Sequence, residues 1–249
     1  MKAMILAAGL GTRLHPLTGD RPKALVEVGG RTLLEITLVR LRDFGIREVI
    51  VNVHHFADMV VDYLAAKQHF GMHIEISRED VLLDSGGGLK RAAWFFLEDV
   101  RQGDEPFLLH NVDVLSNIDL ARMAQFHAAR RALATLAVQN RESSRYLLFD
   151  KQFELCGRRL EREDRTELVR PAQPLQSLAF SGIHIISPRM LTLMTEDGAF
   201  SIIDSYLRLA ANNEKIAAFP ADKSYWRDLG TITSLQQAEQ DLQRGVLAQ

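Results

Sequence analysis

Short apolar segments alternate with segments of helical periodicity in the first half of the sequence, and this alternation restricts the fold more than any other feature. Between residues 32 and 44, Leu34, Leu38 and Leu41 recur at helical spacing. Three other segments are mostly apolar, as expected of strands buried on both faces of a sheet: 3–8, 49–53 and 106–112. Together they predict an α/β fold with a doubly wound, mostly parallel but mixed sheet and helices on both faces.

The second half of the sequence is less regular, but strands and helices can still be assigned. We expect a hairpin or two short strands at 146–155. At 158–170, nine charged residues nearly cancel, which indicates a solvated hairpin or loop, with a partner-binding patch as the alternative. Because no repeat, linker or compositional break occurs, residues 1–249 are interpreted as a single domain. Further strands are expected at 73–77, 133–139 and 178–186, and further helices at 58–66, 87–97, 118–130, 189–194, 202–212 and 233–244.

The overall charge is nearly balanced, with 30 Lys and Arg residues against 32 Asp and Glu residues. A dedicated nucleic-acid-binding protein normally carries a basic excess, so no nucleic-acid partner is expected. No stretch approaches the roughly 18 uninterrupted apolar residues of a membrane span, and Gly9 interrupts the apolar start too early for a signal peptide. The single cysteine, Cys156, cannot form an internal disulfide. These features predict a cytoplasmic protein with no membrane partner.

A glycine-rich loop follows the first expected strand and is the strongest candidate for a phosphate-binding site. It begins as LAAGLGTRL at residues 6–14 and continues through PLT to RPK at residues 21–23. Its glycines allow a ligand to approach the backbone closely, and successive N–H groups in such a loop can bind an anion. Arg13 and Lys23 add positive charge, and charge-assisted contacts are roughly twice as strong as neutral ones.

Two further candidate positions follow expected strands. The motif DSGGG at residues 84–88 lies between a strand and a helix, where a planar ligand could lie against bare glycine backbone and free helix N–H groups. Asp113 follows the expected strand at 106–112. Carboxylates at this end of parallel strands face the ligand crevice of open α/β sheets, and Mg²⁺ favours one or two carboxylates plus phosphate oxygens.

Two widespread phosphate-binding motifs are excluded. No G-x-x-x-x-G-K-[ST] sequence occurs in the chain, so the protein is not a P-loop NTPase. Leu14 stands where the dinucleotide fingerprint G-x-G-x-x-G has its third glycine, which argues against an NAD(P)-dependent oxidoreductase.

The glycine-rich loop, together with DSGGG, FSGI at residues 180–183 and WRDLGT at 226–231, resembles the sugar-1-phosphate nucleotidyltransferases. The resemblance covers almost the whole chain. It implies their Rossmann-like nucleotide-diphospho-sugar transferase fold, with residues 1–130 mainly binding the nucleotide and 131–249 mainly binding the sugar phosphate. Among subfamilies, the sequence is most similar to N-acetylmuramate-1-phosphate uridylyltransferases, and mannose- and heptose-1-phosphate guanylyltransferases are close alternatives.

The resemblance also implies a reaction, the Mg²⁺-dependent transfer of a nucleoside monophosphate from an NTP to a sugar 1-phosphate. UTP with N-acetylmuramate 1-phosphate is the expected pair, and GTP with mannose or heptose 1-phosphate is the alternative. Arg13 and Lys23 match the catalytic positions, while Asp113 and Asp228 match the metal-binding aspartates. The family's nucleotide-binding positions correspond to Ala7, Ala8, Gly9, Gly11, Thr12, Arg13, Lys23, Gly86, Gly87 and Asn111, and its sugar-binding positions correspond to Asn140, Ser181 and Gly182.

The sequence also departs from the family pattern, and other functions stay open. Val112 stands where many relatives have glycine, and the Glu-Lys pair that often follows the strand ending at Gln139 is absent, with Lys151 as the nearest lysine. A phosphocholine cytidylyltransferase would favour an aromatic pocket, and only 7% of the residues are aromatic. A catalytically silent nucleotide-binding subunit would have lost the catalytic and metal-binding residues named above. The protein is expected to be a monomer or a homodimer.

Overall fold

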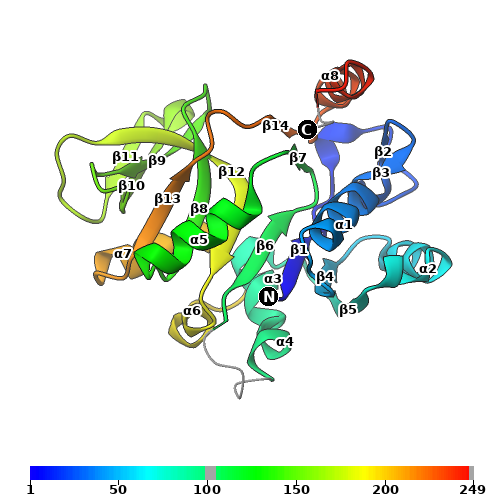
Figure 1. Ribbon diagram of the computed structural model, residues 1–249, viewed down its shortest axis with the longest axis horizontal. Coiled ribbons are helices and arrows are strands. Elements are labelled where there is room, and N and C mark those ends of the chain that lie inside the picture. The colour runs from blue at the N-terminus through cyan, green and yellow to red at the C-terminus, as the bar shows by residue number, and fades with distance from the viewer. Residues whose placement is uncertain (99–104, 247–249) are drawn as a thin grey trace.

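The computed structural model describes residues 1–98 and 105–246, and its largest element is a ten-stranded mixed sheet (Figure 1). The central strands run parallel in the order β6-β1-β4-β5. Their bounds follow the apolar segments of the sequence closely: β1 (Ala3–Leu6), β4 (Glu48–Val53), β5 (His73–Arg78) and β6 (Phe107–Asn111). The expected α/β fold, with a mixed sheet around a parallel core, is therefore confirmed.

One long strand, β12 (Gln176–Ile186), joins the second half of the chain to this parallel core. It pairs antiparallel with β6 along one edge, and it also pairs with strands β8 and β9. The charged segment 158–170 lies in the hairpin of β10 and β11, as one of the two interpretations predicts. The remaining strands of the large sheet are β8 (Ala134–Gln139), β9 (Arg145–Phe149), β10 (Leu155–Leu160), β11 (Arg165–Leu168) and β13 (Ile216–Pro220).

Helices cover both faces of the sheet because successive strand residues point to opposite sides. In β1, Ala3 and Ile5 belong to one hydrophobic core, whereas Met4 belongs to the other. The first core packs against α1 (Leu33–Asp43), α2 (Ala57–Ala66), α5 (Leu120–Arg130) and α8 (Ile232–Gln243). The second packs against α3 (Asp84–Arg91), α4 (Ala93–Leu97), α6 (Arg189–Leu193) and α7 (Ile202–Ala211). In the described ranges, no helix combines the length and apolar character that a membrane crossing requires.

Helix α1 shows why the expected boundaries hold where sequence signals are strong. The Thr32 hydroxyl accepts a hydrogen bond from the Glu35 N–H at 3.0 Å and caps the first turn. Gly45 follows the helix with φ of 101°, a conformation that favours glycine. The expected helix at 87–97 is different: it begins earlier, at Asp84, and is divided at Ala92 into α3 and α4.

Two short ribbons complete the fold, β2 (Glu27–Val28) with β3 (Arg31–Thr32), and β7 (Val114–Ser116) with β14 (Trp226–Asp228). The β7–β14 ribbon lies beyond the carboxyl end of β6 (Figure 1). Leu6 of β1 and Asn111 of β6 are paired in the parallel register, so both strands end side by side. The glycine-rich loop after β1 and the residues after β6 therefore meet at this edge of the sheet.

Candidate active site

The glycine-rich loop carries backbone donors that the protein does not use. The N–H groups of residues 9–11 bond to no acceptor in the described part of the chain. The Ala7 N–H, in contrast, donates to Asn52 Oδ1 at 2.7 Å. Gly11 has φ of 65°, and a Cβ there would lie 3.0 Å from the Lys23 Cβ, so the chain packs closely where it returns to Lys23. The loop thus presents an anion-binding run of donors next to a lysine.

Lys23 forms an ion pair with Asp113, which connects the glycine-rich loop to the end of β6. Lys23 begins a short 3₁₀ helix, Lys23–Leu25, and Asp113 follows the last residue of β6 by two positions. Only 13% of either side chain is exposed, so both charges lie away from bulk water. Each charge is stabilised mainly by the other in this partly buried position.

Asp228 lies beside Asp113 because their strands are paired. In the β7–β14 ribbon Asp228 is opposite Val114, and the Leu229 N–H donates to the Asp113 carbonyl oxygen at 2.8 Å. Arg13 approaches from the glycine-rich loop, with Nη2 3.9 Å from Asp228 Oδ1. The structure therefore brings together the two basic and two acidic residues that the resemblance singled out, although they come from three distant segments.

The two aspartates suit one class of metal better than others. Within residues 1–98 and 105–246, no group of three or more His, Cys, Asp or Glu side chains is placed to hold a metal ion. A zinc site would need several nitrogen or sulfur ligands. Mg²⁺, in contrast, is held by one or two carboxylates together with phosphate oxygens and water, which is the donor set that Asp113 and Asp228 leave to be completed.

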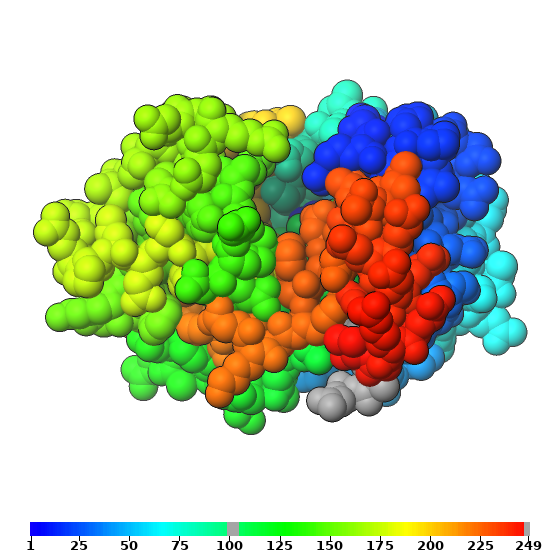
Figure 2. Space-filling view, turned by 90° about the horizontal axis from the view of Figure 1, so that it is seen from above, coloured from blue at the N-terminus to red at the C-terminus, as the bar shows by residue number. Residues whose placement is uncertain are grey.

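A cavity of about 400 Å³, here called the Lys23 cavity, opens beside this cluster. In the view onto this edge of the sheet, a hollow separates the N-terminal residues, in blue, from the residues around 140–170, in green and yellow (Figure 2). Among the expected nucleotide-binding residues, Ala8, Gly9, Lys23 and Asn111 line the cavity, whereas Ala7, Gly11, Thr12 and Arg13 do not. Its other lining residues are Leu6, Asn52, Leu82, Asp84, Ser85, Val112, Asp113 and Ala199.

The DSGGG motif contributes to this cavity differently from the expectation. A Cβ on Gly86 would lie 2.3 Å from the Phe200 ring, and one on Gly87 would lie 2.3 Å from the Gly198 carbonyl oxygen. The first N–H groups of α3 are also bonded, to Asp84 Oδ1 and to the Phe200 carbonyl oxygen. Protein atoms thus occupy the space on the Cβ side of Gly86 and Gly87, and Asp84 and Ser85 of the motif line the cavity.

A second cavity of about 460 Å³, the Tyr146 cavity, lies on the other side of the aspartates. Asp228 lines this cavity and Asp113 lines the Lys23 cavity, so the carboxylates lie where the two cavities meet. The segment 199–203 contributes to both walls, with Ala199 in one and Ser201 and Ile203 in the other. The full lining of the Tyr146 cavity is Ser143, Arg145, Tyr146, Leu147, Arg158, Leu160, Glu163, Phe180, Ser201, Ile203 and Asp228.

The three residues expected to contact the sugar are not among those lining residues. Ser181 is fully buried, and its hydroxyl has no hydrogen-bond partner in the described chain. Gly182 has φ of 72°, and a Cβ there would lie 2.8 Å from Val114 Cγ2, so β7 packs against this position. The Asn140 N–H donates to Asp222 Oδ1 at 2.6 Å. Phe180, next to Ser181, lines the cavity in their place.

Arg141 is a candidate residue that the sequence did not reveal. Its guanidinium lies 3.7 Å from the centre of the Trp226 ring, and Nη2 donates to the Phe180 carbonyl oxygen at 2.8 Å. Nε is buried without a partner in the described chain. Burial lowers the pKa of Arg141, and the negative charge of Asp228 opposes this shift. The only available sequence signal was its position, two residues after β8.

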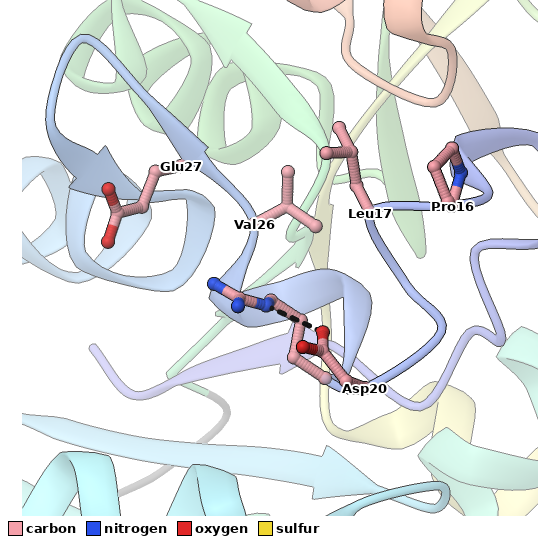
Figure 3. Close-up of a pocket in the computed structure, with 6 residues that line it drawn as sticks. Pro16, Leu17, Asp20, Val26 and Glu27 are labelled. Carbon is pink, nitrogen blue, oxygen red and sulfur yellow. Dashed lines mark hydrogen bonds and ion pairs between the residues drawn. The ribbon is translucent and has the colours of Figure 1, made fainter.

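Arg21, in contrast, does not join the charged cluster. It forms an ion pair with Asp20 at 3.0 Å and lines a separate cavity of about 350 Å³, together with Pro16, Leu17, Val26 and Glu27 (Figure 3). Because its charge is matched by its neighbour, Arg21 adds little to the potential at the Lys23 cavity. The positive charges of Arg13, Arg21 and Lys23, which lie close together in the sequence, are therefore divided between two surfaces.

The chain resembles known proteins over nearly its whole length. A family model described as "Nucleotidyl transferase" matches residues 2–245. The chain belongs to the nucleotidyl transferase family. An N-acetylmuramate alpha-1-phosphate uridylyltransferase from Caulobacter vibrioides is 34% identical to this nucleotidyl transferase over 237 residues, covering 92% of this chain and 91% of the relative. A mannose-1-phosphate guanyltransferase from Yarrowia lipolytica is 29% identical over 233 residues, covering 92% of this chain but 61% of that protein.

Solved structures share the fold of this nucleotidyl transferase. HddC from Yersinia pseudotuberculosis, complexed with GMP-PN, aligns with a TM-score of 0.73 at 22% identity, over 97% of this chain and 99% of that one. A UDP-glucose pyrophosphorylase complexed with UDP-glucose aligns with a TM-score of 0.75 at 18% identity, over 98% of both chains. The family match confirms the enzyme class expected from the sequence, and these structures confirm the fold.

Proposed function

We propose that this nucleotidyl transferase transfers a nucleoside monophosphate from an NTP to a sugar 1-phosphate and releases pyrophosphate. The observation that carries the proposal is the partly buried Lys23–Asp113 ion pair, which lies beside Asp228 where the two cavities meet. In this assignment the Lys23 cavity takes the nucleotide and the Tyr146 cavity takes the sugar. Charged groups between two substrate cavities suit a direct transfer, because catalysis then depends on positioning and charge stabilisation.

The chain's own basic groups supply that stabilisation. An oxygen of the sugar phosphate attacks the α-phosphorus, the new P–O bond forms, and the bond to pyrophosphate breaks, so no covalent enzyme intermediate is needed. Lys23 stabilises the negative charge that develops at the α-phosphate. The free N–H groups of residues 9–11 bind phosphate oxygens, and Arg13, at the exposed side of the cluster, balances the departing pyrophosphate.

Asp113 and Asp228 are the residues that would hold Mg²⁺. When bound, the metal neutralises phosphate charge and orients the triphosphate. In the free protein, Lys23 lies against Asp113 and compensates its negative charge. The pairing of β7 with β14 holds both carboxylates at neighbouring positions.

Arg141 is proposed to bind the phosphate of the acceptor. Its stacking on Trp226 fixes the guanidinium plane, so little side-chain entropy is lost on binding. Arg141 forms no ion pair with a carboxylate in the described part of the chain. The carboxylate that raises its pKa is Asp228, at the proposed reaction centre. The N–H groups of Nη1 and Nη2 that Phe180 does not use can form charge-assisted hydrogen bonds with a phosphate.

We propose UTP and N-acetylmuramate 1-phosphate as the substrate pair. The support comes from relatives of that name: besides the Caulobacter protein, one from Neisseria meningitidis is 30% identical over 241 residues and covers 97% of its own length. GTP with mannose or heptose 1-phosphate is the second candidate. The support is that the Yarrowia relative, which is similar to 92% of this chain, is named a mannose-1-phosphate guanyltransferase.

A pyrophosphate-release screen tests both levels of this proposal. Purified protein is incubated with Mg²⁺, each of the four NTPs and a panel of sugar 1-phosphates, with phosphocholine as an additional acceptor. We expect release that requires both substrates and is fastest with UTP and N-acetylmuramate 1-phosphate. A preference for GTP with mannose or heptose 1-phosphate would replace the pair and keep the reaction. Release only with phosphocholine, or no release with any acceptor of the panel, would refute the sugar-phosphate assignment.

A further inference from the structure

The charged side chain of Arg40, in helix α1, lies in the interior next to the segment that follows Asp113. Its Nη1 donates to the Ser116 hydroxyl at 2.6 Å, and its Nη2 donates to the Ile118 carbonyl oxygen at 2.6 Å. His110 Nε2 lies 3.4 Å from Nη1. All three partner residues are buried, and no carboxylate in the described ranges forms an ion pair with Arg40. The guanidinium is therefore held by neutral acceptors alone.

The protonation state of His110 fits its role as one of these acceptors. Its Nδ1 lies 2.8 Å from the Asn111 carbonyl oxygen, so Nδ1 must carry the proton and donate it. The Nε2 lone pair then points toward Arg40. Burial and the nearby positive charge of Arg40 lower the pKa of His110 to about 3, so the imidazole is neutral at ordinary pH. Burial lowers the pKa of Arg40 to about 10, which leaves the guanidinium charged.

The three acceptors enclose the segment that carries Asp113. His110 precedes this aspartate in β6, Ser116 ends β7, and Ile118 follows β7. The same ribbon carries Asp228, because β7 pairs with β14 and the Leu229 N–H bonds to the Asp113 carbonyl oxygen. The Arg40 guanidinium thus holds both ends of the loop around Asp113. Because this loop is bonded to Leu229, Arg40 also restrains the residue next to Asp228.

Burying the Arg40 guanidinium among neutral partners costs free energy, which its hydrogen-bond geometry can offset. Burying a charge without an opposite charge carries a penalty that an apolar side chain of similar volume would avoid. The planar guanidinium offers several donors in a rigid fork, so it can hold three acceptors at fixed separations. The ammonium group of a lysine keeps the charge but has no such fork, so it can reproduce only part of this pattern.

We propose that Arg40 is a positioning residue that holds the segment 110–118, and with it Asp113 and Asp228, in the geometry that binds the metal–nucleotide complex. The metal-related part of this inference rests on the proposed function. The contacts of Arg40 with His110, Ser116 and Ile118, here called the clamp, act in the free protein as well. Without Arg40, the loop around Asp113 and the ribbon β7–β14 open more often.

Amide hydrogen exchange tests the clamp independently of any activity. The amides to follow are Leu229, bonded to Asp113, and Asn117, bonded to Tyr225. In Arg40→Met, which keeps an apolar stem, we expect both to exchange about 10-fold faster, which corresponds to about 1.4 kcal/mol of lost local protection. Leu38→Ala, in the same helix but without polar contact to the segment, is the control for a general loss of stability.

The result that supports the clamp is faster exchange of the Leu229 and Asn117 amides in Arg40→Met than in Leu38→Ala at equal global stability. Equal exchange in the two variants would overturn it. If Arg40→Met does not fold, Ser116→Ala removes one acceptor and should produce the same local effect on a smaller scale. If Ser116→Ala leaves both amides unchanged, the clamp is refuted.

A metal measurement then tests the functional part. Mn²⁺ binding is followed by electron paramagnetic resonance in the presence of UTP or GTP without acceptor, alongside the Mg²⁺ dependence of pyrophosphate release. We expect Arg40→Met to weaken Mn²⁺ binding about 10-fold, to raise the Mg²⁺ concentration for half-maximal rate similarly, and Arg40→Lys to recover part of the loss. Unchanged metal requirements with a lower rate would overturn the positioning role. If wild-type protein shows no turnover at all, the proposed function fails while the exchange result still decides the clamp.

Discussion

At the scale of single residues, Lys23 and Asp113 depend on each other for compensation of their charges. The two side chains are only 13% exposed, so removing either one leaves the other charge partly buried without its main partner. Such a loss costs more than the value of the pair itself, because the remaining group still lacks full hydration. Keeping both charges is therefore a requirement of the folded protein as well as of the proposed chemistry.

We expect Lys23→Ala to lower kcat by about 10²–10³-fold, because a preorganised charge at the reacting phosphate is lost. Arg21→Ala, in the same loop but on a different cavity, is the matched control and should retain nearly the wild-type rate. Steady-state pyrophosphate release measures both. A Lys23→Ala enzyme as fast as Arg21→Ala would remove Lys23 from the chemistry.

For Arg141, the expected effect lies in acceptor binding. Arg141→Met keeps an apolar contact with Trp226 but loses the charge-assisted contact to the sugar phosphate, so KM for the sugar 1-phosphate should rise about 10–100-fold. KM for the NTP should change little. Arg122→Met, on the exposed surface of α5, provides the control for loss of a positive charge. An equal rise in both KM values would argue against a specific role in the acceptor site.

At the scale of elements, the first half of the chain was predictable because its signals are local. Apolar runs mark β1, β4 and β6, and leucines at helical spacing mark α1, so their bounds differ from expectation by at most a few residues. Helix α3 was misjudged because three glycines at 86–88 weaken every local helix signal. Contacts with Phe200 and Gly198, more than 100 residues away, determine that turn instead.

The candidate site was predictable only in part for the same reason. Lys23 and Asp113 carry motif signals, but the pairing of β7 with β14 joins short segments far apart in the chain, which no local pattern reveals. Arg40 and Arg141 resemble ordinary surface arginines in sequence, since nothing near them indicates burial. Their proposed roles follow from tertiary contacts with Ser116 and Trp226.

The packing of α3 gives a stability prediction. In Gly88→Ala, the added Cβ would lie 2.7 Å from Glu79 Oε1 and 2.8 Å from Asn52 Nδ2, which bond to each other. We expect the free energy of unfolding to fall by about 1–3 kcal/mol, as measured by urea denaturation. At Gly9 a Cβ meets nothing within 4 Å, so Gly9→Ala should leave stability nearly unchanged. Equal effects of the two changes would contradict this account of the packing.

At the scale of the whole molecule, β12 makes the two halves of the chain into one sheet. Its residues pair with β6 of the parallel core and with β8 and β9 of the second half. The second hydrophobic core likewise combines Met4 and Ile50 with Leu136 and Tyr206. Unfolding one half would expose apolar surface of the other, so we propose that the chain is one cooperative unit, in agreement with a single domain.

The two tryptophans allow a direct test of that cooperativity, since Trp94 is in the first half and Trp226 in the second. In Trp226→Phe only Trp94 reports, and in Trp94→Phe only Trp226 reports. We expect each variant's fluorescence transition in urea to coincide with its own circular-dichroism transition, because a single domain unfolds in an all-or-none step. Two separate transitions within one variant would show that the halves unfold independently.

The segment 199–203 has a consequence for engineering the enzyme. It belongs to the second half of the chain, yet Ala199 helps to wall the Lys23 cavity while Ser201 and Ile203 wall the Tyr146 cavity. A chimera that imports residues 131–249 from a relative to change the acceptor would therefore also rebuild part of the proposed donor pocket. Under the proposed assignment of the two cavities, preferences for base and for sugar are therefore coupled, and an exchange of one must be designed together with the other.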